Sequence, residues 1–249
     1  MPTKISVITA ILLTTISANV LAQGNTTIQS FDKSKKLLMT KVYNSDSVRK
    51  TVYCDAQFNS RKKVILPKGY ENSVYKKRAK RIEFEHIIPA ENFGRTFKEW
   101  REGSPMCVKS NGNKYKGRRC ATKASSQFRY MQADLYNLWA AQGSVNAAHS
   151  NFRWSALPHL QTRFGSCNFK YDTKNRLAEP TNKAKGIVAR TAMYMTAEYP
   201  QHYKLSKQQQ RLFSSWDKQY PVTKFECQRA KIIAQIQGNI NPILAKHCK

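Results

Sequence analysis

The sequence predicts a mixed fold of α-helices and short β-strands that is held together by disulfide bonds. Residues 81–94 read RIEFEHIIPAENFG, and their first half alternates apolar and acidic residues before Pro89, as in a strand that ends at a turn. Residues 185–199, 205–216 and 225–236 have the apolar periodicity of amphipathic helices. A central strand segment accompanied by several separate helices is typical of an α+β fold.

The N-terminus has the pattern of an export signal. Lys4 precedes an apolar run, and the small residues that end at Ala22 suit cleavage before Gln23. The run is too short and too rich in threonine to predict a membrane span. We therefore expect a signal peptide over residues 1–22 and a single domain over residues 23–249, in a monomer that is periplasmic or secreted and not inserted into a membrane.

The chain is strongly basic, with 43 lysines and arginines, 15 acidic residues and a formal net charge of +28. The basic residues run through the whole chain and are interleaved with aromatic residues, which favours a polyanionic partner. Nucleic acid is the first candidate. An anionic membrane or lipopolysaccharide surface is the second, but no segment has the pattern of a strongly amphipathic basic helix.

The cysteines number six and stand at positions 54, 107, 120, 167, 227 and 248. An even number without a CxxC pair, in an exported chain, predicts three disulfides and argues against a zinc site. Sequence alone does not choose among the possible pairings. The Cys107–Cys120 loop is short and the easiest to close, and for the others we expect Cys54–Cys248 and Cys167–Cys227.

Further elements are predicted between these landmarks. The expected helices cover residues 31–43, residues 124–138 and a segment that begins near Ser144, and the expected short strands cover residues 52–54 and 64–66. A long loop is expected over residues 102–117, which are rich in glycine, serine, asparagine and lysine. Cysteines near its two ends predict a surface loop closed by a disulfide bond rather than a flexible linker.

Glu85 and His86 stand side by side at the end of the central strand segment. A carboxylate can bind a hard cation, and a neutral imidazole can accept a proton from water near pH 7. Adjacent residues on a regular strand point to opposite faces, so both can serve one site only if the strand breaks, which Pro89 favours. On its own the pair is weak evidence for catalysis, because a histidine beside a buried strand is more often a hydrogen-bonded structural residue. A metalloprotease is disfavoured because the sequence contains no HExxH motif.

Other motifs extend this pattern over most of the chain. They are FEHIIPAENFG at 84–94, KGRRCA at 116–121, RYMQADLYNL at 129–138, GSVNAAHSN at 143–151, FGSCNF at 164–169, ARTAMYM at 189–195, WDKQYPV at 216–222 and IQGNINP at 236–242. In order and spacing the chain resembles the bacterial endonuclease I family of exported nucleases. The resemblance implies a ββα-metal (His-Me finger) core, in which two strands and a helix hold one divalent ion, surrounded by further helices.

The resemblance also implies roles for individual residues. It makes His86 the general base and Glu85 a ligand of one Mg²⁺ ion. The second ligand falls on Asn146, within a G-x-V-N element, and Asn137 is the competing choice. The ordinary pKa of histidine is near neutral, which suits a base without a large shift. We expect a carbonyl or carboxylate to accept the Nδ1 proton of this histidine and so define its tautomer.

The resemblance matches Arg118 to an arginine that contacts the phosphate, and Arg119 beside it leaves an ambiguity of one residue. The chain also departs from the family pattern at two places. Residues 139–141 read WAA where a Pro-Ala pair is expected, and His149 stands where relatives usually carry arginine. His149 could weaken a phosphate contact, make that contact depend on pH, or cap a helix, and we expect the cap.

The function that the resemblance implies is hydrolysis of phosphodiester bonds in DNA, double-stranded above all, with RNA either cut or acting as a competitor. We expect little sequence specificity, because contacts to phosphates do not read bases, and products with 5′-phosphate ends. The alternative is a non-catalytic, exported cationic binder of DNA or envelope polyanions. That alternative explains the charge, the cysteines and the signal, but it does not explain why all the site residues stand at matching motif positions.

Overall fold

The structure is a computed structural model that describes residues 24–248, so the expected signal peptide at residues 1–22 lies outside the described part. The α-helices are α1 (Phe31–Leu37), α2 (Ala90–Gly94), α3 (Lys98–Arg101), α4 (Arg118–Ala124), α5 (Ser126–Gln132), α6 (Gly143–His149), α7 (Asn182–Glu198), α8 (Lys207–Gln219), α9 (Lys224–Gln237) and α10 (Pro242–Ala245). The strands are β1 (Ile82–His86), β2 (Leu138–Gln142), β3 (Arg153–Trp154), β4 (Lys170–Asp172) and β5 (Leu177–Glu179). Short π or 3₁₀ segments are η1 (Leu38–Val42), η2 (Asp46–Val48), η3 (Lys76–Arg78) and η4 (Leu135–Asn137).

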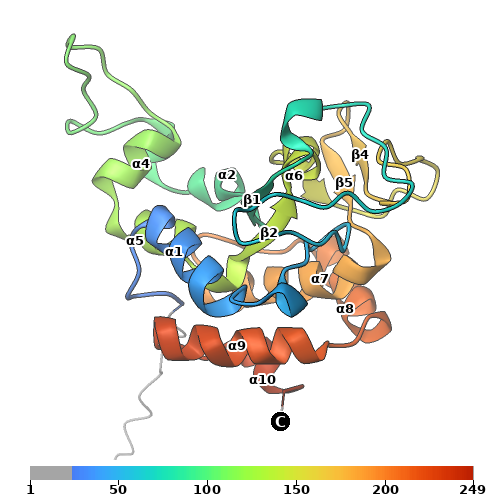
Figure 1. Ribbon diagram of the computed structural model, residues 1–249. Coiled ribbons are helices and arrows are strands. Elements are labelled where there is room, and N and C mark those ends of the chain that lie inside the picture. The colour runs from blue at the N-terminus through green and yellow to red at the C-terminus, as the bar shows by residue number, and fades with distance from the viewer. Residues whose placement is uncertain (1–23, 249) are drawn as a thin grey trace, which may run out of the picture.

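Two antiparallel strands and the helix that follows them form the centre of the fold. β1 pairs with β2 in a register that sets His86 opposite Leu138. Helix α6 begins at Gly143, directly after β2, and packs against both strands (Figure 1). Gly143 suits this close junction because a Cβ there would meet the carbonyl oxygen of Arg78 at 2.6 Å. The arrangement is a ββα unit within a mixed α and β fold, so the predicted fold class is confirmed.

A second, smaller sheet lies beside this unit. Its strand order is β3-β5-β4, with β3 parallel and β4 antiparallel to β5. It follows α6 in the chain and precedes α7. The short strand β3 exposes Arg153 and buries Trp154, as expected when neighbouring strand residues face opposite sides.

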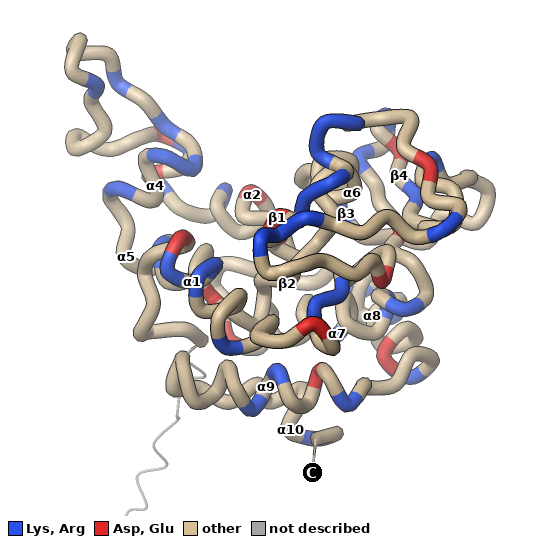
Figure 2. The backbone as a smooth tube through the Cα atoms, in the orientation of Figure 1, with Lys and Arg blue, Asp and Glu red and all other residues tan. Residues whose placement is uncertain are grey.

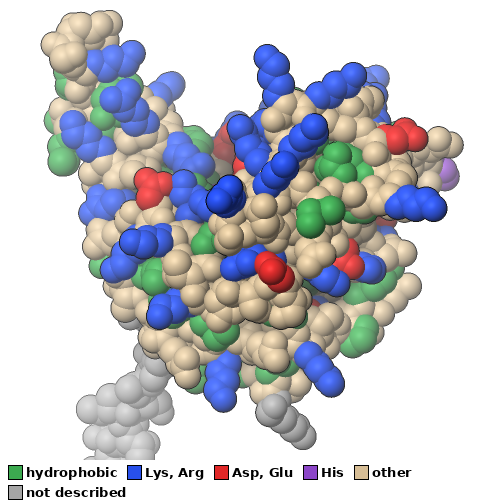
Figure 3. Space-filling view, viewed as in Figure 1, with side chains coloured by type: hydrophobic (Ala, Val, Ile, Leu, Met, Phe, Trp, Pro, Cys, Tyr) green, Lys and Arg blue, Asp and Glu red, His purple; other side chains and the backbone are tan. Residues whose placement is uncertain are grey.

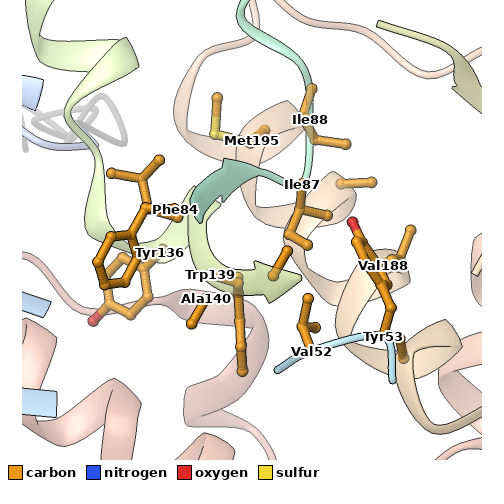
Figure 4. Close-up of a cluster of buried hydrophobic side chains, with 14 of the residues drawn as sticks. Val52, Tyr53, Phe84, Ile87, Ile88, Tyr136, Trp139, Ala140, Val188 and Met195 are labelled. Carbon is orange, nitrogen blue, oxygen red and sulfur yellow. The ribbon is translucent and has the colours of Figure 1, made fainter. Parts of the chain in front are cut away.

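Buried apolar side chains surround the strands of the ββα unit. Figure 4 shows Val52, Tyr53, Phe84, Ile87, Ile88, Tyr136, Trp139 and Ala140 close to the strands, with Val188 and Met195 contributed by α7. Burying one large apolar side chain contributes roughly 1.5–3 kcal/mol to stability. The ends of β1 and β2 are therefore fixed by packing, and side chains that project from these ends have defined positions.

Three C-terminal helices pack on one another beneath this core. The buried guanidinium of Arg190 on α7 bonds to Glu226 on α9 at 2.8 and 2.9 Å and to Asp217 on α8 at 2.8 Å. Thr223 and Glu226 form a reciprocal cap at the start of α9. The predicted helices over residues 185–199, 205–216 and 225–236 are thus confirmed as α7, α8 and α9. No helix within residues 24–248 is both long and apolar enough to cross a lipid bilayer.

The helix predicted over residues 124–138 is wrong in its second half. Helix α5 ends at Gln132, and the last predicted residue, Leu138, begins β2. The Asp134 side chain accepts a hydrogen bond from the Tyr136 N–H, which caps η4 and turns the chain. Every residue of β2 is buried, so its pairing with β1 overrides the local helical periodicity.

The N-terminal predictions are only partly confirmed. The helix over residues 31–43 forms as α1, and its last turns widen into η1. The predicted strands over residues 52–54 and 64–66 are wrong, since these segments form turns and isolated bridges such as Phe58 to Val64. The expected helix near Ser144 is confirmed as α6.

One of the three predicted disulfide pairings is confirmed. Cys107 bonds to Cys120 as expected, but Cys54 bonds to Cys167 and Cys227 bonds to Cys248. The predicted Cys54–Cys248 and Cys167–Cys227 bridges are therefore wrong. The Cys54–Cys167 bridge spans 113 residues, and its pairing depends on how distant segments pack rather than on loop length.

The predicted loop over residues 102–117 projects away from the body of the molecule as a narrow arm (Figure 1). The Cys107–Cys120 bridge closes the arm, and Val108 pairs with Lys114 within it. Figure 2 marks basic residues along the arm and near β1, and Figure 3 shows lysine and arginine side chains over the same half of this face. Basic side chains thus lie near β1 and on the arm, as well as elsewhere on this face.

Candidate active site

A polar pocket of about 580 Å³ opens at the end of β1, between α1, α4 and α6. All four residues that the sequence analysis selects for the site line this pocket. The complete lining is Phe31, Lys35, Lys62, Ile82, Glu83, Phe84, Glu85, His86, Pro89, Ala90, Glu91, Trp100, Arg118, Asn146, Ser150 and Asn151. Glu85 and His86 are adjacent and still paired within β1, and all residues of β1 from Ile82 to His86 line the pocket.

Glu85 is buried and only half satisfied by hydrogen bonds. Its Oε1 accepts a hydrogen bond from the Tyr53 hydroxyl at 2.9 Å and another from the Nδ1–H of His149. Its Oε2 is also buried, and it has no hydrogen-bond partner among the described residues. A buried carboxylate oxygen without a donor is costly and requires an explanation. A cation at the pocket would satisfy this oxygen.

Asn146 projects from α6 toward the same pocket. Its Nδ2–H donates to Glu83 Oε2 at 2.9 Å, which leaves the amide oxygen for another partner. Carboxylate and amide oxygens are the ligands that hard divalent cations prefer. Within residues 24–248 there is no cluster of three or more His, Cys, Asp or Glu side chains with metal-binding geometry. Glu85 and Asn146 both present oxygen-bearing side chains to the pocket, and the carboxylates Glu83 and Glu91 line it as well.

The competing candidate, Asn137, lies elsewhere. Its side chain is fully buried, its Oδ1 accepts from the Ile88 N–H at 2.8 Å, and its Nδ2–H donates to the Ile88 carbonyl at 3.0 Å. Both ends of the amide are therefore used to hold the segment after β1, and Asn137 does not line the pocket.

The hydrogen bonding of His86 defines its tautomer. Its Nε2–H donates to the backbone carbonyl of Gln132 at 2.8 Å, which leaves Nδ1 without a proton and able to accept one. The prediction that a carbonyl or carboxylate accepts the Nδ1 proton is therefore wrong: a carbonyl does accept a proton from the ring, but from Nε2. The ring also stacks on Phe31, with centroids 4.9 Å apart.

The His86 imidazole is strongly perturbed. Burial of the ring, together with the nearby charge of Arg118, lowers its pKa to about 3. The expectation of an unshifted pKa is wrong, because the side chain is 8% exposed beneath Phe31 rather than solvated. At neutral pH the ring is uncharged, as a proton acceptor must be.

Arg118 is the first residue of α4 and faces His86 across the pocket. Its Nε–H donates to the Gln132 side-chain oxygen at 3.2 Å, and its guanidinium lies 5.2 Å from the centre of the Phe31 ring. Arg119 instead lies over the Tyr115 ring at 4.9 Å and does not line the pocket. Of the two neighbouring arginines, only Arg118 can reach a group bound beside His86.

Several residues of the site were not selected from the sequence. Gln132 holds His86 through its carbonyl and Arg118 through its side chain, while Phe31 contacts both of these residues from α1. Tyr53 supports Glu85 from a turn. Gln132 lies in the quoted RYMQADLYNL motif, but nothing in that motif indicates that its backbone carbonyl faces a histidine.

His149 has a different role from the one predicted. It is fully buried, its Nδ1–H donates to Glu85, and its Nε2 lies 3.2 Å from the Phe152 carbonyl oxygen. It therefore orients a site carboxylate, and it neither caps α6 nor reaches the pocket. The other departure, Trp139, lies in β2, where the Arg229 guanidinium covers its indole at 4.0 Å.

Comparison with known proteins finds a matching family and several relatives over most of the chain. The endonuclease I family model matches residues 12–248. A protein named endonuclease-1 from Buchnera aphidicola subsp. Acyrthosiphon pisum is 34% identical over 226 residues, which cover 89% of this chain and 83% of that protein.

Two proteins of Aeromonas hydrophila show the same level of similarity. An extracellular deoxyribonuclease is 34% identical over 227 residues, covering 89% of this chain and 90% of that protein. A periplasmic deoxyribonuclease is 34% identical over 226 residues, which cover 89% of this chain and 87% of that protein. These names place both relatives outside the cytoplasm, which confirms the prediction of an exported protein. Because the family match and the similarity both extend over most of the sequence, the chain belongs to the endonuclease I family of nucleases.

Proposed function

We propose that this chain is an exported endonuclease that hydrolyses phosphodiester bonds of DNA with one Mg²⁺ ion and a histidine base. The observation that carries the proposal is the pocket at the end of β1. Glu85, which has a carboxylate oxygen without a donor, Asn146, whose amide nitrogen is bonded to Glu83, and His86, whose Nε2–H is bonded to Gln132, all line this pocket. A single catalytic domain over residues 23–249, acting as a monomer, is part of the proposal.

His86 acts as the general base. Its Nδ1 takes a proton from a water molecule, and the oxygen of that water attacks phosphorus. The bond from phosphorus to the 3′ oxygen then breaks, and the 3′ oxygen takes a proton from solvent. The products are a 5′-phosphate and a 3′-hydroxyl. The Gln132 carbonyl supports this step, because its hydrogen bond to Nε2–H keeps the ring in the tautomer that can accept at Nδ1.

Glu85 and Asn146 are the residues that would hold the Mg²⁺ ion. The donor set fits the ion, because Mg²⁺ prefers oxygen ligands, keeps several waters and needs few protein side chains. When bound, the ion supplies positive charge to the phosphate oxygens and to the departing 3′ oxygen. Tyr53 and His149 both bond to Oε1 of Glu85, which leaves Oε2 without a partner and able to bind the ion.

Arg118 holds the phosphate that is cut. A guanidinium can donate two parallel hydrogen bonds to a phosphate group. Its bond to Gln132 and its contact with Phe31 restrict its motion, so it faces the substrate with little entropy to lose on binding. Contacts of this kind do not read bases, which supports little sequence specificity and cleavage of RNA as well as DNA.

A plasmid assay tests the proposal. Supercoiled plasmid is incubated with the purified mature protein in Mg²⁺, in EDTA, and in EDTA followed by excess Mg²⁺. We expect nicking in the first and third conditions only, and products that a ligase can reseal because they carry 5′-phosphates. Undiminished nicking in EDTA would overturn the metal role. Binding without cleavage under all divalent-ion conditions would favour the non-catalytic cationic binder instead.

A further inference from the structure

A second polar pocket, of about 730 Å³, adjoins the active-site pocket. It lies between α2, the residues around β3 and β5, and the segment that joins α7 to α8. Its charged side chains are Glu91, Arg95, Arg153, Arg176 and Lys204. The pocket is larger than the active-site pocket, and none of the residues selected for catalysis lines it.

Glu91 and Asn151 line both pockets and form the border between them. Asn151 bonds to both sides of this border: its Nδ2–H donates to Glu91, and its Oδ1 accepts from Arg176 at 2.7 Å. The border is thus built from ordered polar side chains rather than from an apolar ridge. A chain molecule that occupies the active-site pocket can therefore continue into the second pocket across a hydrophilic surface.

The second pocket has an excess of positive charge that the protein does not neutralise. Four cationic side chains line it against one carboxylate, and that carboxylate, Glu91, is already paired with Arg95. Within the described part of the chain, Arg153, Arg176 and Lys204 form no ion pair with any acidic side chain. Like charges gathered around one cavity repel one another, so this arrangement favours an anionic occupant.

The backbone near these cations is also unusual. Arg176 has φ +55, in the left-handed region that residues other than glycine and asparagine rarely adopt. Its carbonyl accepts a hydrogen bond from the Arg153 N–H at 3.0 Å, which fixes the two arginines relative to each other. Arg176 is the last residue of the turn between β4 and β5, and its left-handed φ belongs to that turn, which sets the position of Arg176 in the lining of the second pocket.

We propose that the second pocket binds backbone phosphates of the substrate strand, beyond the bond that is cut in the active-site pocket. This inference rests on the proposed function, because it takes the strand in the active-site pocket to be nucleic acid. A polynucleotide fits better than a small anion, since it presents regularly spaced negative charges and the two pockets share a border. The pocket lengthens the contact with one strand, so it favours polymeric substrates over short ones.

The salt dependence of binding tests the proposal without requiring catalysis. In a His86→Ala background, the pocket variant combines Arg153→Gln, Arg176→Gln and Lys204→Gln. The matched control combines Lys224→Gln, Lys231→Gln and Lys246→Gln, which removes the same charge from exposed positions on and after α9 that line neither pocket. Affinity for a fluorescent single-stranded oligonucleotide of about 24 nucleotides is measured across a series of salt concentrations, after thermal unfolding has shown that both proteins fold.

We expect the slope of log affinity against log salt to fall by about 2 in the pocket variant, because each lost phosphate contact removes roughly 0.7. The control should keep the slope of the parent protein. With active His86 restored, the pocket variant should show a KM for the long oligonucleotide raised at least tenfold, with kcat nearly unchanged. A trinucleotide substrate should show no such difference.

Three outcomes would overturn the inference. The first is an equal slope in the pocket variant and the control. The second is an equal KM effect on short and long substrates, which would indicate a general loss of charge. The third is tight binding of inorganic phosphate that the pocket variant loses while its DNA slope stays unchanged, which would identify a site for a free anion. Failure of the parent enzyme to cut DNA would instead overturn the proposed function, and the binding slopes would still be informative.

Discussion

Two buried carboxylates in this molecule have opposite surroundings. Asp134 lies behind the site, at the start of η4, and every oxygen position is occupied: Oδ2 accepts from the hydroxyls of Tyr194 at 2.8 Å and Tyr199 at 2.6 Å. Its Oδ1 accepts from Gln237 at 3.1 Å and from a backbone N–H at 2.9 Å. Glu85 is also buried and lines the active-site pocket, but only its Oε1 is bonded, and its Oε2 has no donor among the described residues.

The difference separates a carboxylate whose hydrogen bonding is complete from the carboxylate that we propose as a metal ligand. Saturating a buried carboxylate with donors makes it a rigid anchor, and Asp134 anchors the segment that presents the Gln132 carbonyl to His86. Leaving one oxygen open costs stability, and a protein tolerates that cost where a ligand completes the bonding. Burial alone therefore does not distinguish the two carboxylates, whereas the unfilled hydrogen-bonding position of Glu85 does, and it supports the proposed role of Glu85 as a metal ligand.

The largest expected effect is on the rate of DNA cleavage, and it concerns His86, which lines the same pocket as Glu85. Replacing His86 with alanine removes the proton acceptor but leaves the phosphate contacts, so the rate of plasmid nicking should fall about 10²–10⁴-fold while DNA affinity is retained. His159→Ala, at an exposed histidine outside the pocket, is the control and should keep full activity. Rapid nicking by the His86 variant would remove this residue from the role of base.

The next largest effect is on stability, and it concerns Asp134, whose hydrogen bonding is complete. Asp134→Ala leaves two buried tyrosine hydroxyls and the Gln237 amide without their acceptor, so the free energy of unfolding should drop by about 3 kcal/mol. Chemical denaturation measures this loss. Mg²⁺ affinity of the folded protein should not change, and a large loss of Mg²⁺ affinity without loss of stability would contradict the anchoring role.

Glu85→Gln should weaken metal binding and leave stability nearly unchanged, which is the opposite of the effect expected for Asp134→Ala. The amide preserves size but removes the charge at the open oxygen, so the dissociation constant for Mn²⁺ or Mg²⁺ should rise at least tenfold, with little change in stability. Isothermal titration calorimetry without DNA gives this constant directly. Glu71→Gln, at an exposed and unpaired position, provides the matched control. Equal metal affinity in the two variants would exclude Glu85 as a ligand.

The smallest expected effect concerns Glu198, near the saturated cluster. Burial, together with the charge of Asp134, raises its pKa to about 7. The folded state therefore retains a proton that the unfolded state has already lost, and the contribution of Glu198 to stability falls as the pH rises from about 4.5 to 7. Glu198→Gln should remove this decline and stabilise the protein by about 1 kcal/mol at pH 8. Parallel stability profiles of the variant and the parent across that range would show that Glu198 titrates normally.

Much of the site could be predicted because its residues stand in short, specific motifs. Glu85, His86, Arg118 and Asn146 were selected from the sequence, and the structure brings all four to one pocket. The supporting groups could not be predicted. A backbone carbonyl such as that of Gln132 has no sequence signature, and Tyr53 meets Glu85 only because a turn 32 residues earlier packs against β1.

The secondary structure follows the same rule: elements that depend on nearby residues were predicted correctly, and an element that depends on a distant strand was not. Local periodicity correctly indicated α7, α8 and α9, and short separation correctly indicated the Cys107–Cys120 bridge. Local periodicity wrongly predicted a helix up to Leu138, the first residue of β2. The buried residues of β2 form a strand because they pair with β1.

By itself, the sequence determined the family, the export of the protein, its basic charge and the residue types that meet at the pocket, because each of these is written in composition or in contiguous motifs. Only the tertiary structure decided which oxygen of Glu85 stays open, which nitrogen of His86 is free, and that a second basic pocket adjoins the first. The physical reason is that hydrogen bonds and burial join segments that are far apart in the chain, and these contacts exist only once the core has packed.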